Sequence, residues 1–133
     1  MRYAIDALSA IRLVREGVVV SESHQLVAPK SLQTQAMSRL YRRVRAGLLD
    51  SDEARSILDG ITTMRIRLLG DRVSRGRAWR IAEQLNWDEI GDAEFVAVAT
   101  LQADAFVTLD EKLAAQVKDI VTLAPFKALI SAG

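Results

Sequence analysis

The sequence predicts an α/β fold of three layers, in which helices cover both faces of a central parallel sheet of about four to five strands. Short apolar runs alternate with longer amphipathic segments along the chain, and this alternation is typical of strands and helices that follow one another in parallel sheets. Of the 133 residues, 50% are hydrophobic. This is sufficient for one core but the chain is short for two, so residues 1–133 are expected to form a single domain.

The elements are predicted from the spacing of apolar residues and from the residues that begin and end helices. Strands are expected at residues 2–5, 26–28, 64–69, 105–109 and 119–123. Helices are expected at residues 7–16, 29–46, 51–63, 71–87, 92–102 and 111–118. Two segments stay open: residues 18–20 form a strand or a loop, and residues 125–133 form a closing helix or a frayed tail.

Residues with special backbone preferences set several of these boundaries. Pro29 is expected at the first turn of a helix, because its missing N–H would be unpaired there. Gly17 and Gly47 are expected to end helices. Asp71 is positioned to cap the helix that follows it, since its carboxylate can accept from the free N–H groups of the first turn.

The composition narrows the class of protein. With 18 Lys and Arg against 17 Asp and Glu, the net charge favours no particular partner. The absence of cysteine excludes disulfides, thiolate metal sites and cysteine nucleophiles, and it is typical of a cytoplasmic protein. Residues 1–20 lack a signal-peptide pattern, and no apolar run approaches the roughly 18 residues of a membrane span. We therefore expect a soluble, cytoplasmic protein without a membrane segment.

Three aspartates are predicted to meet at one edge of the sheet. Asp6 and Asp110 each follow a predicted strand, and Asp92 opens the helix that leads into the second of these strands. Ligands of open parallel sheets bind beyond the carboxyl ends of the strands. Clustered carboxylates repel one another unless a divalent cation favours their ionised forms, and oxygen ligands suit Mg²⁺ or Mn²⁺. Taken singly, Asp92 and Asp110 are better explained as helix caps, whereas Asp6 is harder to dismiss, although an aspartate after a strand also commonly caps a helix.

The residues around these aspartates resemble the motifs of the PIN domain, and most closely those of the ribonuclease toxins of VapBC toxin-antitoxin systems. The first motif is matched by Asp6 with the Ala-Leu-Ser-Ala that follows it. The second is matched by Asp92 with Ala93, Ala97 and Ala99 behind it, and the third by Thr108-Leu109-Asp110. The resemblance spans essentially the whole chain. It implies a PIN-like fold with Asp6, Asp92 and Asp110 as catalytic metal ligands.

One position departs from the family pattern. Where the family usually has a glutamate on the second helix, this chain has Gln35. An amide keeps a carbonyl oxygen but loses the charge, so metal affinity is expected to fall. Glu94 is a further candidate ligand, although two residues along a helix from Asp92 turn its side chain by about 200°.

The resemblance also implies the reaction, which is hydrolysis of RNA phosphodiesters by a metal-activated water. Thr108 is expected to support Asp110. Arginines crowd two segments of the chain, residues 39–45 and 65–80, and Arg39, Arg42 and Arg43 are the preferred contacts for RNA phosphates because they share a predicted helix with Gln35. A VapB-type antitoxin that covers the acidic site and a homodimer are the implied partners. Tyr41 and apolar positions of the first two helices are candidates for the dimer face.

Two alternatives accompany this hypothesis. Gln35 favours a PIN-like protein with weakened catalysis that binds RNA or a partner. A receiver-type signalling domain also gathers aspartates at strand ends, but it requires adjacent acids after the first strand and a lysine just before a late proline, whereas Ala124 precedes Pro125 here.

The single histidine, His24, cannot supply a two-histidine mechanism and is expected in a surface turn. Finally, the two tryptophans are expected to be core or interface anchors rather than platforms for bases.

Overall fold

Four parallel strands form the central sheet of the computed structural model, which describes residues 1–131. They are β1 (Arg2–Ile5), β2 (Gln25–Pro29), β3 (Ile66–Leu69) and β4 (Ala105–Val107), arranged in the order β3-β2-β1-β4. Ala4 of β1 stands opposite Val27 of β2 on one side and Phe106 of β4 on the other. The chain thus adds strands on one side of β1 and then returns to add β4 on the other.

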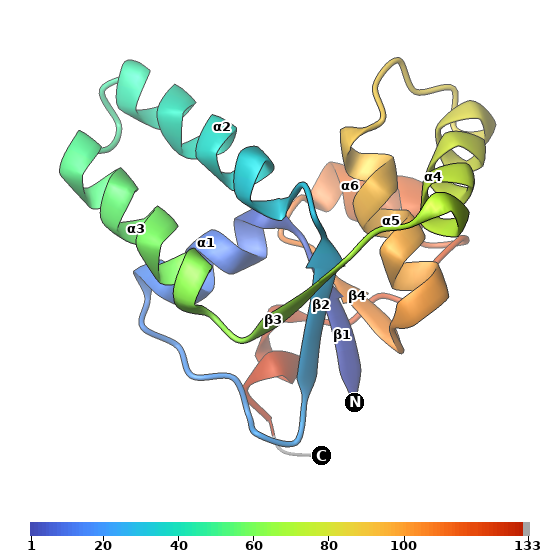
Figure 1. The fold of residues 1–133 in the computed structure, drawn as a ribbon, viewed down its shortest axis with the longest axis horizontal. Helices are drawn as coiled ribbons and strands as arrows, with labels where there is room; N and C mark the ends of the chain where they lie inside the picture. The colour runs from blue at the N-terminus through green and yellow to red at the C-terminus, as the bar shows by residue number, and fades with distance from the viewer. Residues whose placement is uncertain (132–133) are drawn as a thin grey trace.

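Helices cover both faces of this sheet (Figure 1), so the predicted three-layer α/β/α fold is confirmed. The helices are α1 (Ala7–Arg15), α2 (Leu32–Arg45), α3 (Ser51–Thr63), α4 (Arg72–Gln84), α5 (Gly91–Gln102), α6 (Glu111–Val117) and the short 3₁₀ helix η1 (Phe126–Leu129). The first three pack against one another on one face, while α5 packs on the other face beneath α4. This division follows from right-handed crossovers, because reversing the direction of strand addition moves the connecting helices to the opposite face.

The strands are short and apolar because helices shield them from both sides. Ile5, Val27 and Phe106 are completely buried. Helix α5 is also apolar on nearly every side, with buried residues from Ala93 to Ala99, because it is sandwiched between the sheet and α4.

The sheet has four strands rather than five because the segment predicted as the last strand pairs through a single residue. Leu123 forms an isolated parallel bridge with Phe106. Residues 18–20 form no strand, and β3 begins at Ile66, later than predicted, because Met64 N is still bonded to Ile61 O at the end of α3. The predicted strand at residues 105–109 ends at Val107.

The predictions at glycine and aspartate boundaries are confirmed. Gly17 and Gly47 follow α1 and α2 with φ angles of +62° and +75°, the left-handed conformation in which glycine has no steric cost. Asp71 caps α4 by accepting from Ser74 N at 2.8 Å, and Ser74 Oγ accepts from Asp71 N in return.

The prediction for Pro29 was wrong. Pro29 is the last residue of β2, opposite Leu69 of β3, and helix α2 begins only at Leu32. Its fixed φ and missing N–H are compatible with the end of a strand as well as with the first turn of a helix. Tertiary pairing with β3 decides between the two.

Near the C-terminus, η1 occupies part of the segment for which a closing helix or a frayed tail was predicted. That prediction also covered residues 132–133, which lie outside the described residues. Within residues 1–131, no helix is both long enough and apolar enough to cross a membrane.

Candidate functional site

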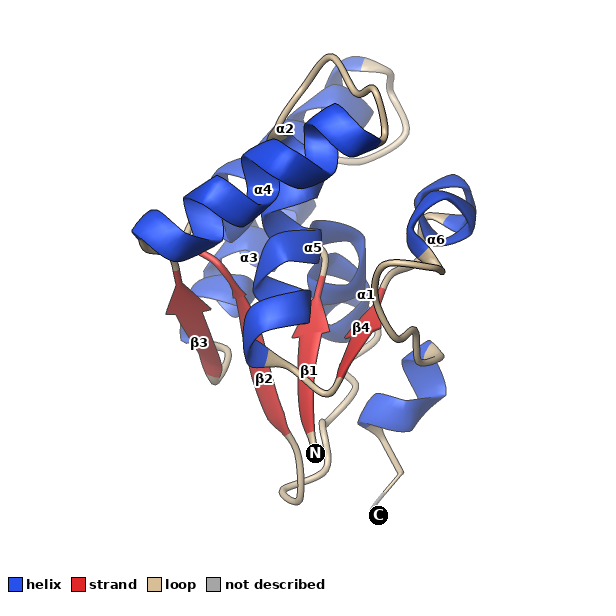
Figure 2. Ribbon diagram, turned by 90° about the vertical axis from the view of Figure 1, so that its right-hand side faces the viewer, coloured by secondary structure: helices blue, strands red, loops and turns tan. Residues whose placement is uncertain are grey.

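The carboxyl ends of β1 and β4 lie side by side (Figure 2), and polar residues follow both strands. Asp6 comes directly after β1, and Thr108 comes directly after β4. The order of strands reverses between β1 and β4, so this edge is the position where open α/β sheets form a crevice.

Asp6 is a buried carboxylate that is held on both oxygens. Its side chain is 6% exposed. Oδ1 accepts from Ser9 N at 2.8 Å, which caps α1, and Oδ2 accepts from Thr108 Oγ1 at 2.5 Å. A carboxylate oxygen has two lone pairs, so each oxygen can still accept one further partner.

Thr108 connects Asp6 to Asp110. Its hydroxyl donates to Asp6 and accepts from Asp110 N at 3.1 Å. Asp110 Oδ1 accepts from Leu113 N at 3.0 Å and thereby caps α6. The capping explanation therefore holds for both Asp6 and Asp110, but it uses only part of their acceptor capacity.

Asp92 differs from the other two aspartates because it caps no helix. It is the second residue of α5, after Gly91, and its side chain reaches solvent at the edge of the site. Partial burial raises the pKa of Asp92, and the charges of Asp110, Asp6 and Glu89 raise it further, whereas the nearby guanidinium of Arg39 opposes the shift. The three aspartates therefore lie close enough to influence one another electrostatically.

Among residues 1–131, no three acidic or histidine side chains are gathered closely enough to coordinate one metal ion together. Magnesium in proteins usually keeps several waters and takes only one or two carboxylates. The oxygen atoms of Asp92 and Asp110, with the remaining lone pairs of Asp6, are compatible with such a hydrated ion in number and chemistry.

A hollow of about 780 Å³ opens beside these residues. Its walls come from α2, the α4–α5 loop and α6: Gln35, Arg39, Arg42, Trp87, Asp88, Glu89, Gly91, Asp92, Asp110, Lys112, Leu113 and Gln116. We call it the acidic hollow after Asp92 and Asp110. Gln35, Arg39 and Arg42 share one face of α2, because residues separated by four and seven positions lie along one side of a helix.

Gln35 lies against the start of α5. A Cβ atom built on Gly91 would be 2.8 Å from Gln35 Nε2. Only glycine allows this approach without a shift. The neutral amide of Gln35 therefore lies at the start of α5, and Gln35 and Asp92 line the same hollow.

Two predicted site residues lie elsewhere. Arg43 is exposed and does not line the acidic hollow, because it follows Arg42 by one residue and points about 100° away. Glu94 lines a different hollow, together with Lys30 and Arg75. Arg43 therefore lies off the face of α2 that lines the acidic hollow, and Glu94 turns away from Asp92, as the rotation of about 200° between them indicates.

Sequence reasoning missed seven of the wall residues, and it also missed Ser9, whose backbone N–H donates to the Asp6 carboxylate. The seven are Trp87, Asp88, Glu89, Gly91, Lys112, Leu113 and Gln116. Lys112 and Gln116 were assigned to a helix without a role, since nothing local shows which face of α6 meets the hollow. Ser9 had a usable signal, because an aspartate three residues earlier at the start of a helix predicts its backbone bond to Asp6.

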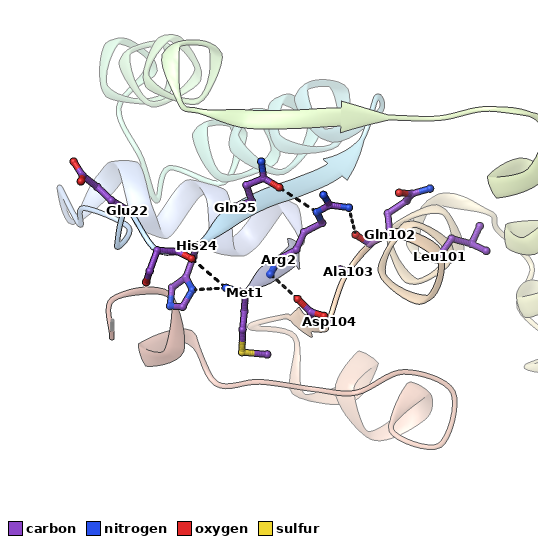
Figure 3. A pocket seen from close by; sticks show the side chains of 10 residues that line it. Met1, Arg2, Glu22, His24, Gln25, Leu101, Gln102, Ala103 and Asp104 are labelled. Carbon is purple, nitrogen blue, oxygen red and sulfur yellow. Dashed lines mark hydrogen bonds between the residues drawn. The ribbon is translucent and has the colours of Figure 1, made fainter. Parts of the chain in front are cut away.

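A second hollow, of about 470 Å³, lies at the opposite edge of the sheet (Figure 3). Several of its polar groups are paired with one another. The Met1 amino group lies 3.2 Å from His24 Nδ1, Arg2 Nε donates to Gln25 Oε1 at 3.1 Å, and Arg2 N donates to Asp104 Oδ2 at 2.8 Å. These contacts join β1, β2 and the end of α5, so the polar residues around this hollow are explained by their role in holding these elements together.

No protein-family model matches the sequence, and no curated protein matches it. The fold is similar to that of a solved structure, the crystal structure of PAE2754 from Pyrobaculum aerophilum, with a TM-score of 0.71 and 19% sequence identity. The similarity covers 98% of this chain and 93% of the other chain. At this level of identity the similarity concerns the fold alone.

Proposed function

We propose that this protein is a cytoplasmic, metal-dependent endoribonuclease of the PIN-domain type, and the toxin component of a type II toxin-antitoxin system. The observation that carries the proposal is the arrangement of the aspartates where the strand order reverses: Thr108 joins Asp6 to Asp110, and Asp110 and Asp92 line the same hollow. The motif resemblance of the sequence supports the same function independently.

Asp92 and Asp110 would hold Mg²⁺ or Mn²⁺, and Asp6 would contribute through its remaining lone pairs. When bound, such an ion supplies an activated water and stabilises negative charge on the phosphate. The chain's own contribution is orientation. Thr108 fixes the Asp6 carboxylate and the backbone at Asp110, so that little reorganisation is needed when an anionic substrate arrives.

Arg39 and Arg42 would bind the RNA backbone. Both line the acidic hollow on the α2 side, opposite the start of α5, and guanidinium groups form strong bonds to phosphate oxygens. Lys112 on α6 adds a third cationic group to the same walls. These cations offset the repulsion between RNA and the aspartates.

Cleavage of a labelled RNA pool in the presence of Mg²⁺ tests this function. Asp92→Asn and Asp110→Asn are expected to lose activity, because each removes a charged metal ligand. Glu94→Gln is the matched control. It removes a carboxylate only two residues from Asp92, but Glu94 lines another hollow. Loss of activity in all three variants, or in none, would contradict the proposed site.

We also propose a VapB-type antitoxin that covers the acidic hollow with a basic side chain. The proposal rests on the family resemblance and on the negative charge of Asp92 and Asp110. Purification of the protein expressed from its own operon is the test. An accompanying small protein whose removal unmasks ribonuclease activity is expected.

A homodimer is the second proposed assembly. The apolar stripes of α1 and α2 are buried inside the monomer, as Leu13 and Leu40 illustrate, so they are unavailable for a dimer face. Met37 and Tyr41, which are 52% and 63% exposed, remain on the outer side of α2. Light scattering measures the oligomeric state of wild type and of Tyr41→Glu. A dimeric wild type and a monomeric variant would identify this face.

One observation favours a second candidate, a PIN-like RNA-binding protein with weak catalysis. Gln35 brings a neutral amide to the wall beside Asp92. Under this alternative, wild type binds RNA but cleaves it slowly. Gln35→Glu should increase the rate of cleavage, because it adds a negative charge beside Asp92. Equal activity of the two proteins would remove the alternative.

A further inference from the structure

We propose that Trp87 is the platform on which an unpaired base of the RNA substrate stacks. This inference rests on the ribonuclease function proposed above and specifies which part of an RNA enters the acidic hollow. It reverses the expectation from sequence, which treated both tryptophans as anchors.

The end of α4 fixes the backbone of Trp87. Asn86 adopts the left-handed conformation with φ 56°, Asn86 N donates to Glu83 O at 3.1 Å, and Trp87 N donates to Ala82 O at 2.9 Å. These two bonds form a Schellman motif, in which the residue at the Trp87 position packs back on the helix. Trp87 is therefore held by α4 although it begins a loop.

Trp87 is partly buried, packs against the hydrophobic core, and also lines the acidic hollow with Asp92 and Asp110. An aromatic ring that is held by the core beside a hollow can receive a second flat ring with little loss of conformational entropy. Stacking of bases on such aromatic rings is a common mode of binding single-stranded RNA.

The charges of the walls indicate a base rather than a phosphate beside Trp87. Asp88 and Glu89 follow it directly, and both line the hollow. Carboxylates repel phosphates but accept hydrogen bonds from the amino groups of bases. The cationic groups that suit phosphates come from other elements, α2 with Arg39 and Arg42, and α6.

The base must be unpaired because a base inside a duplex is already stacked on both sides. The volume of about 780 Å³ lies within the range of sites that enclose a small ligand. A single splayed nucleotide therefore fits the hollow better than a helix does.

Trp79 provides a matched control. It lies on α4, is 63% exposed, and does not line the acidic hollow. The protein has two tryptophans, so Trp79→Phe leaves Trp87 as the sole indole and Trp87→Phe leaves Trp79.

The experiment follows indole fluorescence while a short single-stranded oligoribonucleotide is added with Mg²⁺. Both variants carry Asp6→Asn to prevent turnover. Fluorescence of Trp79→Phe is expected to be quenched saturably, whereas that of Trp87→Phe stays constant. A fully paired RNA duplex should quench neither. By fluorescence anisotropy, Trp87→Ala should weaken binding of the single strand roughly tenfold and Trp79→Ala by less than about twofold.

The outcomes separate the two proposals. If RNA is bound and cleaved while Trp87 fluorescence does not change, stacking is wrong and the ribonuclease function stands. If Trp87 responds only to a co-purified protein, the ring belongs to a protein interface and the inference is overturned. If wild type neither binds nor cleaves RNA, both proposals fail together. Because the Trp79→Phe measurement leaves Trp87 unchanged, a folding defect at Trp87 cannot imitate its result.

Discussion

Thr108 shows how a single residue can organise the proposed site. Its hydroxyl donates to the buried Asp6 carboxylate and accepts from Asp110 N. A buried carboxylate is tolerated only when its oxygens receive hydrogen bonds. Thr108 thus stabilises the charge on Asp6 and fixes the direction of the chain that carries Asp110.

We predict that Thr108→Val lowers the free energy of unfolding by about 1.5–3 kcal/mol, because it removes a hydrogen bond to a buried charged group. Thr108→Ser keeps the hydroxyl, so its free energy of unfolding should fall much less. Urea denaturation of the two variants measures the difference. A valine variant as stable as the serine variant would mean that the bond to Asp6 contributes nothing.

Arg42 and Arg43 are neighbours in sequence, but only Arg42 lines the acidic hollow. Arg42→Ala is expected to weaken RNA binding and to reduce the slope of log K against log salt by about 1, the effect of losing one phosphate contact. Arg43→Ala should leave the slope unchanged. Filter binding at several salt concentrations measures both slopes, and equal slopes for the two variants would place RNA elsewhere.

Asp92 is expected to impose a pH dependence on the metal-free protein. Burial and the neighbouring carboxylates raise its pKa above the ordinary 3.8. A raised carboxyl pKa contributes stability that is present below the pKa of the unfolded chain and is lost as pH rises through the folded value. Asp92→Asn should therefore gain stability relative to wild type between pH 4 and 7.

Thermal denaturation in a chelating buffer measures this pH effect. The gain at pH 7 should be less than about 1 kcal/mol, because solvent screens the exposed Asp92 side chain, and it should vanish near pH 3. A difference that stays constant from pH 3 to 7 would show that the ionisation of Asp92 is not the cause.

At the scale of elements, close helix packing depends on particular small residues. On α3, a Cβ atom at Gly60 would lie 2.5 Å from Val14 Cγ1 of α1. Val14 is β-branched and packs against the core, so it cannot rotate away without cost. Gly60 therefore sets the distance between α1 and α3.

Two glycine replacements test this packing. Gly60→Ala should destabilise the protein by about 1 kcal/mol net, because crowding of Val14 exceeds the gain in helix propensity. Gly76→Ala on α4 should stabilise it by about 0.8–1 kcal/mol, since within residues 1–131 no atom outside the adjoining backbone of α4 and the two neighbouring residues lies within 4 Å of the added Cβ. Melting temperatures of both variants provide the comparison. A stabilised Gly60→Ala would mean that the two helices separate without cost.

At the scale of the whole molecule, the proposed site depends on segments that are distant in sequence. The acidic hollow combines α2, the α4–α5 loop, Asp110 and α6. These elements lie on different layers, and the sheet holds them at one edge (Figure 1). A ligand that bridges the walls should therefore stabilise the complete fold.

Addition of Mg²⁺ or Mn²⁺ is expected to raise the melting temperature, and a chelator should reverse the effect. At a metal concentration 100 times the dissociation constant, the free energy of unfolding should rise by about 2.7 kcal/mol. The double variant Asp92→Asn, Asp110→Asn should lose the metal-dependent shift, whereas Glu94→Gln should keep it. An equal shift in all proteins would indicate binding outside the acidic hollow.

Much of the fold could be predicted because its determinants are local. Strand and helix alternation, the glycines after α1 and α2, and the cap at Asp71 depend on residues within one or two turns of each other. The positions of Asp6 and Asp110 after their strands were predictable for the same reason. The end of β2 could not be predicted in this way, because Pro29 suits two local conformations and pairing with β3 selects one.

The sequence by itself determined the three-layer class, the single sheet and the aspartates at its carboxyl edge. Only the tertiary structure decided which side chains surround them: Gln35 against Gly91, Arg42 but not Arg43, and Trp87 in the wall. The physical reason is distance along the chain. Periodicity and capping act between near neighbours, whereas the acidic hollow forms where packing brings α2, the α4–α5 loop and α6 together, and no local pattern encodes the rotation of one helix against another.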